Sequence, residues 1–436
     1  MRSRLVASSL AFCTVLASPA LGQAPPAQDR IGELERKIEV LAGEVERLRL
    51  GEAAEEPALL PELGLGPAAA KIYKKSPKRV SVGGYGEMTY QNFRGRKQNG
   101  TTAGKADEAD LLRAVLYTGY KFNDWITFNS EIEFEHASES KRGEVSVELA
   151  ALDFRPWKAF GVRTGLLLMP VGIINETHEP TTFHGVRRPG VESSLIPTTW
   201  RENGVGVFGE LGPVEYRSYL VTGLQAVTDS GTSPKVKGFD ASTALRNGRS
   251  SGSKSLADDF ALVGRLDVKP LEGTVFGGSF YAGEADHEVV ASVPVTLWDL
   301  HAKSEWRGLE LRALYAQGHI GNADTLNSAQ SIAAGSNKSV GSDFFGGYLE
   351  AAFDLFSLRP MGGHYLAPFL RYERYDTQWK VPTGWTKNPS NSRVEYTFGL
   401  TYKPVSQVAV KADHQILKDQ GLTGIGQTNL GIGYIF

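Results

Sequence analysis

The sequence predicts an all-β transmembrane barrel of about 16 antiparallel strands, preceded by a short α-helical coiled coil. Three observations lead to this prediction. Long segments alternate apolar and polar residues, the connections between them alternate between short and long, and the chain opens with a secretory signal. The clearest segment, 393–402, reads R-V-E-Y-T-F-G-L-T-Y, with Val, Tyr, Phe and Leu on one face and Arg, Glu and Thr on the other. Alternation over roughly nine residues or more is typical of strands between lipid and a polar lumen.

The composition excludes several other classes of protein. The 436 residues include 47 Lys and Arg against 49 Asp and Glu, which gives a net charge of −2, and 41% of the residues are hydrophobic. The hydrophobic fraction excludes wholesale disorder, and the near-neutral charge argues against a nucleic-acid-binding protein with a basic face. No stretch of the mature chain approaches the roughly 18 consecutive apolar residues that a spanning helix needs.

Residues 1–22 are expected to be a signal peptide. A basic start is followed by an apolar stretch over 5–16 and by a small-x-small cleavage site over 20–22. The only cysteine, Cys13, lies within this segment, so the mature chain from Gln23 contains none. A secreted chain without cysteine has no disulfide scaffold and no thiolate for catalysis or metal binding.

Residues 23–50 are expected to form a periplasmic coiled coil. Apolar side chains follow a heptad spacing from 29 to 50, at Ile31, Leu34, Ile38, Leu41, Val45 and Leu48. Because an isolated helix of this length is marginal, we expect another part of the molecule to hold several copies side by side. Residues 29–50 are also a candidate for binding peptidoglycan or a periplasmic partner. The alternative is an amphipathic helix that packs on its own domain.

Residues 51–78 are expected to be an unstructured linker, because 51–57 and 63–67 are rich in Gly, Pro and charge. A basic run over 74–79 follows. This run is expected either to be solvated or to lie near anionic lipid head groups.

Residues 79–436 carry the strand pattern. The alternating segments lie near 80–93, 109–122, 124–137, 144–156, 159–170, 203–212, 213–225, 258–269, 272–284, 292–305, 307–319, 343–357, 363–376, 393–403, 405–417 and 424–436. In transmembrane barrels the tight turns face the periplasm and the long loops face outward, which places both ends of this barrel at the periplasmic side. Aromatic residues beside the tight turns, such as Trp125, Trp157 and Tyr434, indicate an interfacial girdle. A soluble all-β repeat protein is the alternative.

A signal peptide, a coiled coil and a barrel that ends in Phe436 together resemble the phosphate-selective porin O and P family of Gram-negative outer membranes. The local match runs through 165–172, 175–180, Arg188-Pro189 and 196–204, and the resemblance covers 79–436. It implies an outer-membrane porin with its N-terminal region in the periplasm, in contact with lipid and lipopolysaccharide. It also implies a homotrimer of water-filled channels for passive diffusion of small polar or anionic solutes, phosphate among the candidates.

The connection 170–202 is expected to fold into the barrel as a constriction loop, because it is too apolar for a loop in solvent. Its candidate constriction residues are Arg187, Arg188, Glu179, Glu192, His178 and Arg201. Arg187 and Arg188 are the candidate anion site, facing Glu179 and Glu192, because guanidinium groups bind phosphate or carboxylate through two hydrogen bonds. Alternatively these arginines pair with carboxylates to hold the loop against the wall, or the loop covers the barrel as a lid or subunit contact.

The strand register also places charged side chains in the lumen. The candidate wall residues are Arg113, Glu131, Glu133, Arg265, Lys303, Arg312, Arg371, Arg393 and Lys411. Acidic residues outnumber basic ones on this face, which departs from the clustered lysines and arginines expected of a phosphate-specific pore. The sequence therefore favours a broad diffusion channel.

No enzyme is predicted. The eight histidines are scattered, and the sequence contains no serine elbow, phosphate-binding loop or dinucleotide-binding loop. His178 and His184 lie six residues apart without a third ligand nearby in sequence, so neither a metal site nor a cofactor is expected. A different class of function remains open, in which the barrel only anchors an envelope-tethering protein and the coiled coil binds the cell wall or a periplasmic partner.

Overall fold

The structure is a computed structural model that describes residues 36–43, 59–74, 79–137, 143–228 and 236–436. The chain divides into two units, 1–58 and 59–436. In the first unit, residues 36–43 form a helix with exposed side chains. The predicted signal peptide and the rest of the predicted coiled coil lie outside the described residues. Among the residues described, no helix has the length and apolarity needed to cross a membrane.

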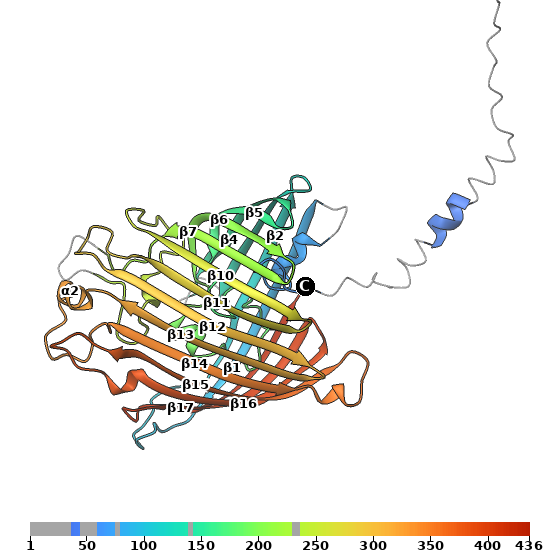
Figure 1. The fold of residues 1–436 in the computed structure, drawn as a ribbon. Coiled ribbons are helices and arrows are strands. Elements are labelled where there is room, and N and C mark those ends of the chain that lie inside the picture. Colours follow the sequence, from blue (N-terminus) through green and yellow to red (C-terminus); the bar gives the residue numbers. More distant parts are fainter. Residues whose placement is uncertain (1–35, 44–58, 75–78, 138–142, 229–235) are drawn as a thin grey trace, which may run out of the picture. The chain divides into compact units, whose positions relative to one another are not determined.

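The second unit is a closed antiparallel barrel of 16 strands, joined in sequence order (Figure 1). Its strands are β1 (Val80–Phe93), β2 (Glu108–Lys121), β3 (Ile126–Glu135), β4 (Val145–Trp157), β5 (Phe160–Leu168), β6 (Arg201–Leu211), β7 (Val214–Thr222), β10 (Phe260–Leu271), β11 (Thr274–Glu284), β12 (Pro294–Trp306), β13 (Leu309–Ile320), β14 (Asp343–Phe353), β15 (Tyr365–Lys380), β16 (Ser392–Val405), β17 (Val408–Asp419) and β18 (Gln427–Ile435). The barrel closes because β1 pairs with both β2 and β18.

The loops contain a few short elements. These are the β8–β9 pair (Val227–Thr228 and Val236–Lys237), helix α2 (Ala323–Ala329) and the single turns η2 (Val191–Leu195), η3 (Arg246–Gly248), η4 (Leu355–Ser357) and η5 (Pro389–Asn391). All of them lie in connections between barrel strands, so they do not interrupt the wall.

The outer surface of the barrel is apolar and its inner surface is polar. On β16, Tyr396, Phe398 and Leu400 are exposed, whereas Thr397 and Thr401, which alternate with them, are 0% exposed. A protein in water does not leave a whole ring of strands coated with exposed apolar side chains, so this surface is suited to lipid. The predicted barrel of 16 antiparallel strands is confirmed, and the predicted strand segments coincide with the observed strands to within a few residues.

The two ends of the barrel differ in loop length. Tight turns such as 212–213 join the strands at one end, and long connections such as 169–200 and 223–259 join them at the other.

Strand β15 runs further than predicted, to Lys380. Near the end of this strand, Thr377 donates a hydrogen bond to the Ala241 carbonyl oxygen at 2.6 Å, which joins the strand to the long connection between β7 and β10.

The prediction of an unstructured linker over 51–78 is wrong for most of the residues that the structure describes there. Residues 61–73, here called the plug segment, fold into the tight-turn end of the barrel and end in the single turn η1 (Ala69–Tyr73). Leu63, Leu65 and Ile72 are 3% or less exposed. Burial of these side chains is favourable, and the barrel interior supplies partners for the segment's backbone, so the chain docks there although it lacks strand or helix periodicity.

Candidate functional site

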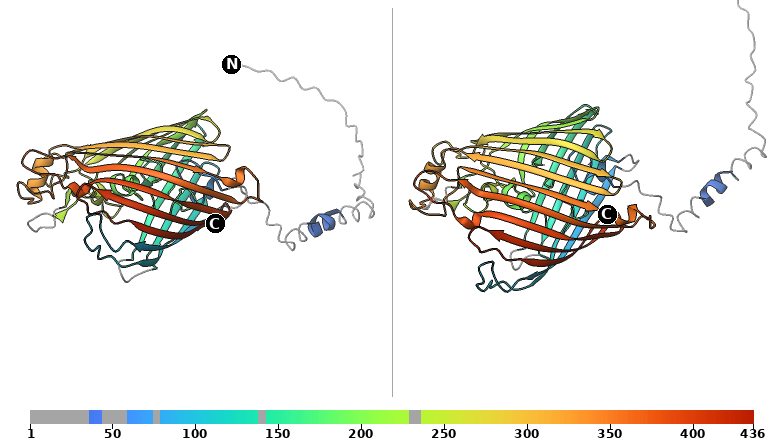
Figure 2. Two further views of the ribbon diagram at one scale, coloured as in Figure 1. Left: turned by 90° about the horizontal axis from the view of Figure 1, so that it is seen from below. Right: turned by 60° about the horizontal axis from the view of Figure 1, so that its bottom comes forward.

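The connection between β5 and β6, residues 169–200, crosses the barrel interior (Figure 2). Carboxylates of the wall accept hydrogen bonds from its backbone. The Gly172 amide donates to Asp299 Oδ2 on β12 at 3.0 Å, and the Val186 amide donates to Asp413 Oδ2 on β17 at 2.6 Å. Because β12 and β17 are far apart around the barrel, the loop spans the lumen rather than covering its mouth.

Basic side chains of the wall hold the same loop through its carbonyl oxygens. Lys411 donates to the Phe183 oxygen at 2.8 Å and Lys403 donates to the Thr181 oxygen at 2.9 Å. Arg371, which is 0% exposed, donates to the His184 oxygen at 3.3 Å and pairs with carboxylates on its own and the next strand. These wall cations therefore position the loop.

The two loop glutamates do not face the loop arginines, so that part of the sequence hypothesis is wrong. Glu192 accepts hydrogen bonds from the Ile173 and Ile174 amides at 2.6 and 2.7 Å and from the Tyr348 hydroxyl at 2.6 Å. Burial raises the pKa of Glu192. The carboxylate oxygens of Glu192 therefore accept hydrogen bonds from the loop's own backbone and from the wall.

Glu179 is the second of these carboxylates, and it binds the plug segment instead. It accepts hydrogen bonds from the Ala68 and Ala69 amides at 2.9 to 3.0 Å. A Cβ added at Gly66 would lie 2.5 Å from Glu179 Oε1, so only glycine allows this close approach. The carboxylate thus joins the constriction loop to the plug segment.

Arg187 and Arg188 are left without a carboxylate. The Arg187 guanidinium is exposed and donates to Gln91 Oε1 at 3.0 Å, and Arg188 donates to the His178 carbonyl oxygen at 3.0 Å. Within the described ranges neither side chain has an ion pair. The structure therefore does not show the alternative in which these arginines pair with carboxylates to hold the loop against the wall. Gln91 lies near the end of β1, which places Arg187 toward the long-loop end of the lumen.

Arg246 and Arg249, from the long connection between β7 and β10, complete a cluster with them. Burial and the nearby Arg188 lower the pKa of Arg246, and burial and Arg246 lower the pKa of Arg249 to about 10. Both keep their charge near neutral pH. Each donates a hydrogen bond to a backbone oxygen of the constriction loop, at Ser193 and Thr198 respectively, both at 2.6 Å. We call Arg187, Arg188, Arg246 and Arg249 the arginine cluster.

Sequence reasoning missed Arg246 and Arg249. They lie in a long connection with no strand periodicity, and the sequence does not show that this connection folds onto the constriction loop. Two constriction candidates remain, and both contact the wall. His178 is buried, with Nε2 3.1 Å from Glu131 Oε1 on β3. Arg201 is the first residue of β6 and pairs with Glu148 on β4 at 2.9 Å.

The wall candidates all lie on the inner side of the barrel. Arg113, Glu131, Glu133, Arg312, Arg371 and Lys411 are buried, whereas Arg265, Lys303 and Arg393 are partly buried. Arg113 pairs with Glu87 and Glu133 at 3.4 Å, and Arg393 lies over the Tyr375 ring. Most of these charges are balanced by a neighbour on the wall.

The plug segment is fastened to the wall of β3 to β5. The Tyr73 hydroxyl donates to Asp153 Oδ2 at 2.5 Å, and Arg163 donates to the same carboxylate and to the Leu63 oxygen at 3.1 Å. Asn129 donates to the Ala69 oxygen at 2.9 Å. These contacts hold the segment against one side of the lumen.

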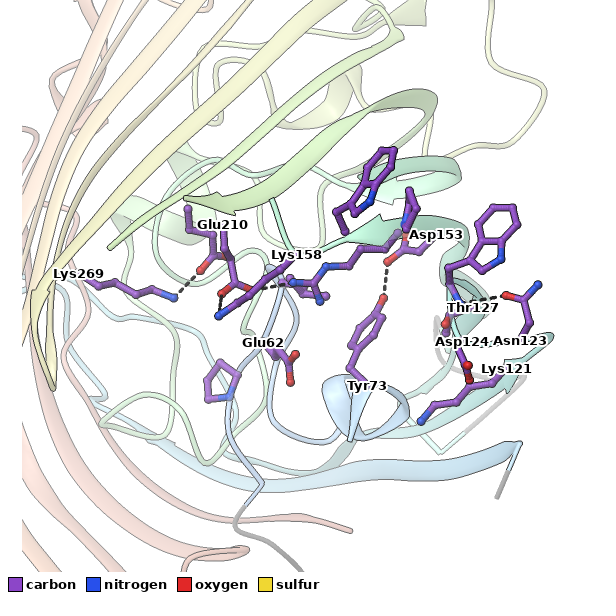
Figure 3. Close-up of a pocket in the computed structure, with 17 residues that line it drawn as sticks. Glu62, Tyr73, Lys121, Asn123, Asp124, Thr127, Asp153, Lys158, Glu210 and Lys269 are labelled. Carbon is purple, nitrogen blue, oxygen red and sulfur yellow. Dashed lines mark hydrogen bonds and ion pairs between the residues drawn. The ribbon is translucent and has the colours of Figure 1, made fainter. Parts of the chain in front are cut away.

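Open space remains beside the plug segment. A cavity of about 1140 Å³ opens at the tight-turn end, between the plug segment and residues such as Lys158, Glu210 and Lys269 (Figure 3). A second cavity of about 190 Å³ continues inward, between the plug segment, the constriction loop and the wall of β7 to β13. Both are lined by residues 61–63, Glu215 and Lys269, so together they mark a path past the plug.

The inner part of this path carries paired charges. Arg217 and Arg265 both contact Asp267, at 2.7 and 2.8 Å, and Lys269 contacts Glu215. Lys303 pairs with Glu305 at 2.6 Å. The path is polar and nearly neutral here, in contrast to the arginine cluster.

The fold is that of outer-membrane porins. The chain aligns with OmpF of Salmonella typhi, solved in complex with daunomycin, at a TM-score of 0.54 and 11% identity, over 82% of this chain and 97% of that one. It aligns with an anion-selective porin from Comamonas acidovorans at a TM-score of 0.50 and 12% identity, over 82% and 99%. Identities this low relate the folds only.

No family model matches the sequence. An uncharacterized protein of Aquifex aeolicus (strain VF5) is 38% identical over 367 residues, which cover 82% of this chain and 80% of that protein. The chain therefore belongs to the same family of proteins as this Aquifex aeolicus relative.

Proposed function

We propose that this protein is an outer-membrane channel for passive diffusion of small polar solutes, with a preference for anions. The observation that carries the proposal is the arginine cluster. The four guanidinium groups lie on or beside the constriction loop and have no ion pair among the described residues, whereas the charges further inside are paired. Clustered arginines that are not held in ion pairs attract anions and repel cations in a pore. Phosphate is one candidate solute, because guanidinium groups can hold it through two hydrogen bonds.

The proposal places the barrel in the outer membrane of a Gram-negative bacterium, with the N-terminal region in the periplasm. Its support is the apolar outer surface of the barrel, the rings of Trp125 and Trp157 exposed at the tight-turn end, and the fold shared with known porins. The sequence resemblance to the phosphate-selective porin O and P family agrees with this. No catalytic activity is part of the proposal.

We further propose a homotrimer in contact with lipid and lipopolysaccharide. In the helix over 36–43, Ile38 and Leu41 of the heptad pattern are both 63% exposed, so this apolar stripe is available to another helix. The same stripe supports the second candidate, a tether that binds peptidoglycan or a periplasmic partner. The proposed channel activity is compatible both with a trimer held by this helix and with a tether.

Charge reversal in the arginine cluster tests the proposed selectivity. In Arg187→Glu/Arg246→Glu, the ratio of chloride to potassium permeability should fall. Reversing one charge about 8 Å from a passing ion in water raises the energy of chloride and lowers that of potassium by about 1 kcal/mol each, which is roughly fivefold for each ion per substitution. The measurement is the reversal potential of single channels in a planar bilayer under a KCl gradient.

Arg307→Glu is the matched control. Arg307 is exposed in the tight turn between β12 and β13, over the Trp306 ring, so the same charge change there should leave the permeability ratio unchanged. Equal ratios in the double variant and the wild type would show that the arginine cluster does not face the ion path.

A further inference from the structure

His178 of the constriction loop faces two glutamates of the wall in a buried group. Its Nε2 lies 3.1 Å from Glu131 Oε1 on β3 and 3.6 Å from Glu148 Oε2 on β4. The three side chains are 1 to 2% exposed, and one atom from each lies within 4.8 Å of the others. Residues far apart in the sequence thus bring one imidazole and two carboxylates together.

The orientation of the His178 ring is fixed by its other nitrogen. Nδ1 lies 2.8 Å from the Asn175 carbonyl oxygen, which can only accept a hydrogen bond, so Nδ1 carries a proton. In the neutral ring, the Nε2 lone pair then points at two carboxylate oxygens, an unfavourable arrangement unless a cation lies between them. Histidines that bind metals commonly have this arrangement, with one nitrogen donating to a backbone carbonyl and the other free to coordinate.

The carboxylates offer unoccupied buried oxygens. Glu131 Oε2 and Glu148 Oε2 have no hydrogen-bond partner. Arg201 contacts only Oε1 of Glu148, and the Tyr117 hydroxyl contacts only Oε1 of Glu131. A buried carboxylate oxygen without a partner costs free energy, and a bound cation would remove that cost.

Carboxylates outnumber cations around the group. Glu87 and Glu133, which share Arg113, adjoin Glu131 and Glu148, and only Arg201 is added on the positive side. Glu179 and Arg188 also act on the group, through Glu131 and Glu133 respectively. A divalent cation would be attracted to this excess of carboxylates.

We propose that Glu131, Glu148 and His178 bind one divalent first-row transition-metal ion, such as Zn²⁺. One imidazole nitrogen with two carboxylates is a ligand set for these ions, whereas Mg²⁺ and Ca²⁺ prefer oxygen ligands alone. The ion fastens the constriction loop to the β3–β4 wall. This role does not depend on the solute that the channel carries.

Metal binding by the untagged full-length protein in detergent tests the site. After treatment with EDTA and its removal, Zn²⁺ is titrated by calorimetry, and the bound metal is counted by elemental analysis. We expect one tightly bound ion per chain. In His178→Gln the affinity should fall at least roughly 100-fold, because loss of even an outer partner of a ligand typically costs 10–100-fold. Glu148→Gln should weaken binding in the same way.

His184→Gln is the matched control. His184 is a second buried histidine of the same loop, and its Nε2 faces a single carboxylate, Glu310 Oε2 at 3.1 Å, so this variant should keep the ion. Zn²⁺ should also raise the unfolding temperature of the wild type and of His184→Gln but not of His178→Gln. Wild-type protein without a tightly bound ion, or equal binding in His178→Gln, would overturn the proposal and leave His178 as an imidazolium paired with the carboxylates.

Discussion

Deletion of the plug segment, residues 61–73, is expected to raise the single-channel conductance severalfold. The segment occupies the tight-turn end of the lumen, where Leu63, Leu65 and Ile72 are buried inside the barrel. The observed path past it narrows to the cavity of about 190 Å³ between the plug segment and the constriction loop. Its removal widens this part of the path while leaving the strand pairing of the wall intact. The measurement is the conductance in symmetric KCl.

A substitution in the wall provides an independent test of the same result. A Cβ at Gly119 on β2 would lie 2.8 Å from Ile72 Cγ1, so Gly119→Leu should displace the plug segment and raise the conductance as well. Gly95→Ala is the control, because a Cβ at Gly95 meets no atom within 4 Å. Unchanged conductance in both the deletion and Gly119→Leu would show that ions bypass the plug segment.

Arg371→Met is expected to lower the free energy of unfolding by about 3–5 kcal/mol, the usual cost of removing one partner of a buried ion pair. Arg371 is 0% exposed and pairs with Glu350 at 3.0 Å and Glu373 at 2.8 Å. It also donates to the His184 and Arg187 carbonyl oxygens, so its loss should loosen the constriction loop and make the open current noisier. The measurement is urea unfolding of the protein in lipid vesicles, followed by tryptophan fluorescence.

Lys303→Met is the control for this experiment. The Lys303–Glu305 pair is accessible to water, with side chains 36% and 45% exposed, so its loss should cost no more than about 1 kcal/mol. Similar stability in Arg371→Met and Lys303→Met would contradict the structural role given to Arg371.

The barrel was predictable because its signal is local and repeated. In β16 each residue's neighbours already show which face it occupies, and the same two-residue period recurs in fifteen other strands. The insertion of residues 170–202 into the lumen was also predictable, since a loop that contains Ile174, Val186 and Trp200 must bury them somewhere.

The partners inside the lumen were not predictable from the sequence. Glu192 accepts from the Ile173 and Ile174 amides, and Glu179 accepts from the plug segment, although each is near an arginine in the sequence. Such contacts depend on how irregular backbone folds back, which no residue period encodes. The sequence of the plug segment contains one indication that it is buried. Leu63, Leu65 and Ile72 are more apolar than a spacer in solvent requires.

The central claim is that the protein forms a channel whose arginine cluster favours anions. The most direct test is the reversal potential of the purified wild-type channel in a planar bilayer with KCl at different concentrations on the two sides. The account predicts discrete conductance steps and a reversal potential of the sign that chloride permeation produces. A reversal potential of the sign that potassium permeation produces would contradict the anion preference, and the absence of conductance steps would contradict the channel itself.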